Sequence, residues 1–73
     1  MTRYIAEVIC PEKKYRVELL YDGSDLEAAL DIARKEQRQL NMFDTSGYYV
    51  TLDRYEDGKL AEAIDFMQGV KEE

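Results

Sequence analysis

The chain has 73 residues with one proline, four glycines and 45% hydrophobic content, which allows one compact domain over residues 1–73 and leaves no room for a second. Its 16 acidic and 10 basic side chains give a net charge of −6, which argues against direct contact with nucleic acid and against adhesion to an anionic membrane. Histidine is absent, so the commonest general base and metal ligand is missing. These numbers favour an acidic protein-interaction module without a metal or a cofactor.

Cysteine usage and the apolar runs indicate the compartment. The single cysteine, Cys10, cannot form an internal disulfide, which is typical of a reducing intracellular setting. Glu7 and Glu12 interrupt the apolar residues near the N-terminus before they reach the length of a signal peptide. No run approaches the roughly 20 apolar residues that span a bilayer. We therefore expect a cytoplasmic protein.

Residues 4–21 are predicted to form an antiparallel hairpin. Residues 4–10 alternate between two faces, and residues 15–21 do the same after a polar turn opened by Pro11. In the second run, one face is expected to carry Tyr15, Val17, Leu19 and Tyr21.

A helix is predicted next. Ser24 and Glu27 have the spacing of a capping box, in which each side chain satisfies a backbone amide of the first turn. Apolar or long side chains then recur every three or four residues at Leu26, Ala29, Leu30, Ala33, Gln37 and Leu40. This stripe is suited to lying on a sheet.

The second half of the chain is more ambiguous. Met42 and Phe43 are candidates for a short strand, and residues 48–55 alternate as a clear strand with Tyr49, Asp53 and Tyr55 on its outer face. Residues 60–70 have a helical period, although the Asp-Gly pair just before them is also a hairpin signal. Helix propensity favours the helix there.

The fold class expected from these elements is α+β, with a small antiparallel sheet of three to four strands in the order β-β-α-β-α. The helices are expected to pack on one face of the sheet, leaving the other for solvent or a partner. The residues predicted for the helix-covered face are Val8, Val17, Leu19, Val50 and Leu52.

Catalytic and metal chemistry find little support in the sequence. Cys10 has no histidine to activate it, and a Glu7–Glu18 pair facing across the hairpin would have Arg16 as a neighbour, which favours cross-strand charge pairing. Residues 53–64 begin like a calcium loop but place tyrosine at the third position and isoleucine at the twelfth. An enzyme is therefore not expected.

Charge asymmetry and tyrosine content are the remaining features. Residues 1–43 carry eight acids and seven bases, whereas residues 44–73 carry eight acids and three bases. Gathered on one side, these groups would present a field suited to a basic groove on a partner. The predicted binding residues are Asp53, Glu56, Asp57, Glu62 and Asp65 as phosphate surrogates, with Tyr49 and Tyr55 as anchors.

Three segments, residues 28–37, 48–55 and 56–59, together resemble the small anti-CRISPR proteins of phages, in particular a strand-rich type I-F inhibitor with one helix. The resemblance implies a phage protein acting in the host cytoplasm as a non-enzymatic inhibitor. Such a DNA mimic binds the type I surveillance complex (Cascade) and blocks target DNA.

Three alternatives stay open. The first is a generic intracellular interaction module, such as an antitoxin or accessory subunit, held by apolar contacts at an exposed sheet edge. The second is a homodimer, rather than a monomer, formed through an open face that would carry Ile5, Ile9 and Leu20. The third is a small hydrolase using Glu7 and Glu18.

Overall fold

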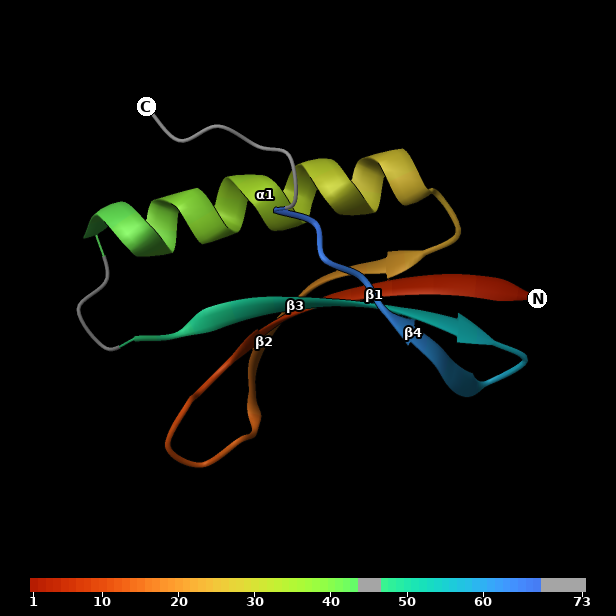
Figure 1. Cartoon of the computed structure of the whole chain (residues 1–73), viewed down its shortest axis with the longest axis horizontal. Helices are drawn as coiled ribbons and strands as arrows, with labels where there is room; N and C mark the ends of the chain where they lie inside the picture. Colours follow the sequence, from red (N-terminus) through yellow and green to blue (C-terminus); the bar gives the residue numbers. More distant parts are fainter. Residues whose placement is uncertain (44–46, 68–73) are drawn as a thin grey trace.

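The computed structural model describes residues 1–43 and 47–67. These residues form a small α+β fold in which one helix covers one face of a four-stranded antiparallel sheet (Figure 1). The sheet has the strand order β2-β1-β3-β4. In chain order the elements are β1 (Thr2–Ile9), β2 (Arg16–Gly23), α1 (Leu26–Phe43), β3 (Tyr49–Glu56) and β4 (Lys59–Ala63).

The predicted hairpin of β1 and β2 is confirmed. The turn between the strands is closed by the Cys10 amide, which donates to the Tyr15 carbonyl at 3.0 Å, and by the Lys14 amide, which donates to the Cys10 carbonyl at 2.8 Å. Lys14 takes a positive φ of 59°. Cys10 itself is buried with a free thiol, as expected for a small apolar side chain.

The predicted orientation of Val17 and Leu19 toward the core is wrong. Their exposed fractions are 45% and 44%. The pairing of β1 with β2 shifts register twice, between Ala6 and Glu7 and again between Val8 and Ile9. Each extra residue on β2 reverses the side to which the following residues point, so strict alternation fails along this strand.

The helix starts one residue later than the capping box predicts. Asp25 is the capping residue, because its Oδ1 accepts a hydrogen bond from the Ala28 amide at 3.2 Å. The Asp25 amide is satisfied by the hydroxyl of Tyr21 at 3.1 Å, and a Glu27 carboxylate is not needed there. The helix also continues to Phe43, so the proposed strand at residues 42–43 is wrong.

The helix predicted over residues 60–70 is also wrong, because β4 occupies Lys59–Ala63. Asp57 and Gly58 form the two-residue turn before it, with φ angles of 51° and 82°. Two positive φ angles in succession match the twist of an antiparallel hairpin, so the Asp-Gly signal outweighs the helical period. The last residues of that prediction, 68–70, lie outside the described residues.

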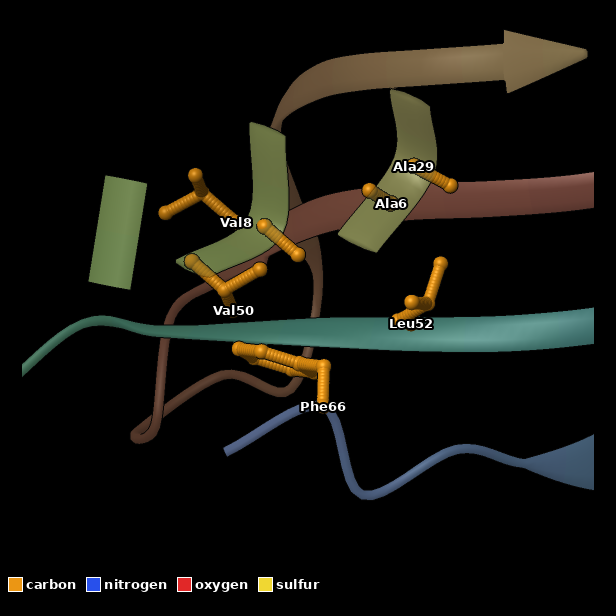
Figure 2. Close-up of a cluster of buried hydrophobic side chains, with 7 residues drawn as sticks. Ala6, Val8, Ala29, Val50, Leu52 and Phe66 are labelled. Carbon is orange, nitrogen blue, oxygen red and sulfur yellow. The ribbon is translucent and has the colours of Figure 1, made fainter. Parts of the chain in front are cut away.

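The core lies between α1 and the two central strands, and its buried residues are Ala6, Val8, Ala29, Ala33, Val50, Leu52 and Phe66 (Figure 2). Alanines on both the helix and β1 let the helix approach the sheet closely. The predicted core positions Val8, Val50 and Leu52 are confirmed, and so are Ala29 and Ala33.

Residues 64–67 turn back from β4 and close one side of this core. The Ile64 amide donates to the Leu52 carbonyl at 2.8 Å. Arg34 of the helix donates from Nε to the Phe66 carbonyl at 2.6 Å. Phe66 is buried beside Val50 and Leu52, although it lies in a segment without regular secondary structure (Figure 2).

Candidate functional site

The sheet face turned away from α1 is covered by no element that the structure describes (Figure 1), and we call it the open face. Strand pairing assigns its residues, because paired residues share a face. It carries Arg3, Ile5, Glu7 and Ile9 of β1, Arg16, Leu19 and Asp22 of β2, Tyr49, Thr51, Asp53 and Tyr55 of β3, and Leu60 and Ala63 of β4.

Apolar and aromatic side chains are neighbours across the open face. Ile9 lies opposite Tyr49 in the pairing of β1 with β3, and Leu60 lies opposite Tyr55 in the pairing of β3 with β4. Leu60 is 60% exposed. Tyrosines beside aliphatic residues on an uncovered surface are typical of protein-binding sites, since they bury a large area while the hydroxyl keeps a polar contact.

The structure brings together three of the seven predicted binding residues. Tyr49, Asp53 and Tyr55 alternate along β3 with buried Val50 and Leu52, so all three belong to the open face. Their shared orientation is as the sequence predicts. The remaining four, all carboxylates, lie elsewhere.

Glu56 and Glu62 lie on the helix side of the sheet and share one cation. Arg54 donates from Nη1 to Glu56 at 2.5 Å and from Nε to Glu62 at 3.3 Å. The Thr2 hydroxyl donates to Glu56 at 2.6 Å, and this hydrogen bond, aided by Arg54, lowers the pKa of Glu56 below its ordinary value. Both carboxylates are therefore engaged by side chains of neighbouring residues in the sheet.

Asp57 and Asp65 are exposed at two separate turns. Asp57 contacts the amino group of Met1, and its own amide donates to the Met1 carbonyl at 3.0 Å. Asp65 accepts a hydrogen bond from the Met67 amide at 3.3 Å, which orders the turn after β4. The five carboxylates predicted as phosphate surrogates thus do not converge on one surface.

The residues considered for catalysis make structural contacts. Glu7 lies opposite Leu19 on the open face and pairs with Arg16 at 2.8 Å, as the cross-strand interpretation predicts. Glu18 lies opposite Val8, on the helix side, so the two glutamates do not face one another. Among residues 1–43 and 47–67 there is no cluster of three metal-ligating side chains.

Two features were not predicted from the sequence, one on the open face and one on the helix side of the sheet. Leu19 was assigned to the core, and nothing in the sequence marks the bulge that turns it outward. Arg54 was not recognised as the partner of Glu56 and Glu62. A two-residue turn at Asp57 and Gly58 would by itself place Ala61 opposite Arg54. Glu62 takes that position because the pairing shifts register between Arg54 and Tyr55.

In comparisons with known proteins, no family model, no curated protein and no solved structure matches the chain.

As for membranes, the described residues include no helix with the length and apolar character needed to cross one.

Proposed function

We propose that this chain is a non-enzymatic protein-binding module whose docking surface is the open face of the sheet. The observation that carries the proposal is the row of aliphatic and tyrosine side chains on a face that no described element covers. Leaving these groups in water gains nothing for the fold, whereas a partner surface would bury them. An interaction module fits the alternative expected from the sequence, such as an antitoxin or an accessory subunit.

The residues available for chemistry support a binding role over a catalytic one. Glu7 is engaged by Arg16, and Cys10 is buried in the turn of the first hairpin. A nucleophile or an acid-base pair needs a free partner group within hydrogen-bond reach. Neither residue has such a partner among those that the structure describes.

The anti-CRISPR role stays a prediction and is a more specific form of this proposal. It would place the protein in the cytoplasm of a host cell, bound to the type I surveillance complex. Its support is the resemblance and the net charge of −6. The ion pairs at Glu56 and Glu62 neutralise part of the negative charge that a DNA mimic would present, which favours docking through apolar contacts.

The experiment compares partner capture by matched variants. A Tyr49→Ala/Tyr55→Ala double variant removes both rings from the open face. Tyr15→Ala, the control, removes a ring at the first hairpin turn that is 54% exposed. We expect the double variant to lose the captured partner, with a loss in affinity of about tenfold or more, and the control to retain it. Thermal unfolding confirms that all variants fold.

Charge reversal separates docking from mimicry. For docking through the open face, Asp57→Lys/Glu62→Lys binds nearly as well as wild type, and affinity changes little between low and high salt. A steep loss of affinity with salt, together with a larger loss on charge reversal than on tyrosine removal, would instead support an acidic inhibitor.

A further inference from the structure

Asp53 occupies the middle of the open face with apolar neighbours on both adjoining strands. It lies opposite Ile5 of β1 on one side and opposite Ala63 of β4 on the other. Along β3 its neighbours on the same face are Thr51 and Tyr55. None of these four neighbours carries a positive charge.

The other partly buried carboxylates of this face have partners. Glu7 is paired with Arg16 at 2.8 Å, and Asp22 accepts two hydrogen bonds from Arg3, that from Nε measuring 3.0 Å. Asp53 makes no ion pair with any residue in the described ranges 1–43 and 47–67. Partial burial raises the pKa of Asp53 above its ordinary value, which agrees with a carboxylate that lacks a cation.

We propose that Asp53 receives an arginine side chain that a partner protein presents from within an apolar patch, an inference that rests on the proposed docking function. A guanidinium supplies the missing charge through a two-pronged hydrogen bond to the carboxylate. Its flat surface also stacks on an aromatic ring, and Tyr55 lies two residues away on the same face. A lysine ammonium would pair with the charge but would use the tyrosine less well.

A second copy of this chain fits the site less well. The two arginines that lie at the open face, Arg3 and Arg16, are already engaged by Asp22 and Glu7. Packing two open faces together would also bring two unpaired Asp53 carboxylates into the same dry region, which is unfavourable for like charges. Charge complementarity therefore points to a different, basic protein.

Selection from a random peptide library displayed on phage tests the chemistry without a known partner. The full chain is the target, and the best enriched peptide is then measured against wild type, Asp53→Asn and Asp31→Asn. Asp31 is an exposed carboxylate on α1 and serves as the matched control. We expect enriched peptides to contain arginine flanked by apolar residues. We expect Asp53→Asn to weaken the best peptide by about tenfold or more, with Asp31→Asn unchanged.

Replacing the arginine of the peptide by citrulline, in combination with Asp53→Asn, tests whether these two side chains contact each other. Citrulline keeps the shape of arginine and removes its charge, so it should weaken binding to wild type and cause little further loss with Asp53→Asn. Enriched peptides without a basic residue, equal binding by Asp53→Asn, or no enrichment at all would overturn the arginine inference.

The outcomes also separate this inference from the proposed function. Peptides that depend on Tyr49 and Tyr55 but ignore Asp53 would leave the docking face standing and remove the arginine contact. Peptides indifferent to both tyrosines would count against the docking face itself. A dimer in solution that the Tyr49→Ala/Tyr55→Ala variant abolishes would identify a second copy as the occupant and overturn the arginine inference.

Discussion

Asp53 bears a charge at a position where the fold gives it no compensation. Its neighbours Ile5 and Ala63 are apolar, and burial raises its pKa. A carboxyl group whose folded pKa exceeds its unfolded value holds its proton more tightly in the folded state. Its ionisation therefore lowers the free energy of unfolding near neutral pH. A residue that lowers stability in this way is typical of a functional surface.

The Asp53→Asn variant tests whether the ionised Asp53 carboxylate lowers the free energy of unfolding. We expect the free energy of unfolding to rise at about pH 7, by roughly 0.5 kcal/mol or less, as is usual for substitutions outside the core. The gain should shrink as the pH falls through the interval between the unfolded pKa of aspartate, about 3.9, and the raised folded pKa, because wild type then takes up the proton. Urea unfolding over a pH series measures it. A gain that stayed constant across the series would show that the desolvated charge is not its source.

The sequence was sufficient to place Tyr49, Asp53 and Tyr55 together. This succeeded because β3 pairs with β1 in an unbroken register from Thr2 and Glu56 to Ile9 and Tyr49, so alternation translates directly into faces. The partners of Glu56 and Glu62 were not predictable in the same way. The contact of Glu62 with Arg54 exists only when residues 59–63 form a strand, with a register shift beside Arg54, and the sequence favoured a helix there.

Among the elements, β2 shows why a strand can be recognised while its faces are not. Its existence follows from β-branched and aromatic residues beside a turn, and the structure confirms it. The two register shifts opposite β1 are set by pairing with another strand and leave no mark in local composition. Leu20 and Tyr21 consequently pack against the core, while Val17 and Leu19 are exposed.

β4 illustrates a conflict between two local signals. The apolar period of residues 60–70 favours a helix, whereas the turn that precedes them favours a hairpin. Pairing with β3 gives the strand backbone hydrogen bonds and brings Glu62 to Arg54. A helix over so few residues would lack a comparable stabilising contact, since short helices are only marginally stable without packing against another element.

The turn at Gly58 is therefore the feature on which β4 depends. Gly58→Ala places a side chain at a φ of 82°, where L-residues are strained, although no atom lies within 4 Å of the new methyl group. We expect a loss of about 1–2 kcal/mol in the free energy of unfolding, caused by the backbone alone. Asp57→Asn is the matched control, because asparagine tolerates a positive φ and should be nearly neutral. Chemical denaturation compares the two. Equal stability of Gly58→Ala and wild type would mean that the hairpin does not need this turn.

For the whole molecule, the net charge does not show where the charged side chains lie. Eight acids and three bases in residues 44–73 suggest one acidic surface. The fold instead sets Glu56 and Glu62 on the helix side, Asp57 at a turn and Asp53 on the open face. Strand alternation and turns separate charges that are close in sequence. The net charge therefore describes solubility and long-range steering more than the shape of a binding site.

The core of the whole molecule is shallow. Most of its buried residues are alanine or valine, and Leu52 is the largest side chain that the described residues bury completely. Phe66 contributes more apolar area than its neighbours, and it comes from the segment after β4 rather than from a strand or the helix (Figure 2). Arg34 fixes that segment to the helix through the Phe66 carbonyl. Folding of the sheet and of residues 64–67 should therefore be cooperative.

Phe66→Ala tests whether this segment belongs to the cooperative unit. Truncating a buried phenylalanine costs about 3–5 kcal/mol, and a chain of this length has a total stability of only about 4–11 kcal/mol. We expect the urea midpoint to fall sharply, with much of the protein unfolded at low denaturant. Leu60→Ala provides the control, because Leu60 lies close by in the chain but is 60% exposed. Its free energy of unfolding should fall by only about 0.5 kcal/mol. If both variants lost equally little free energy of unfolding, residues 64–67 would lie on the surface of a fold that is stable without them.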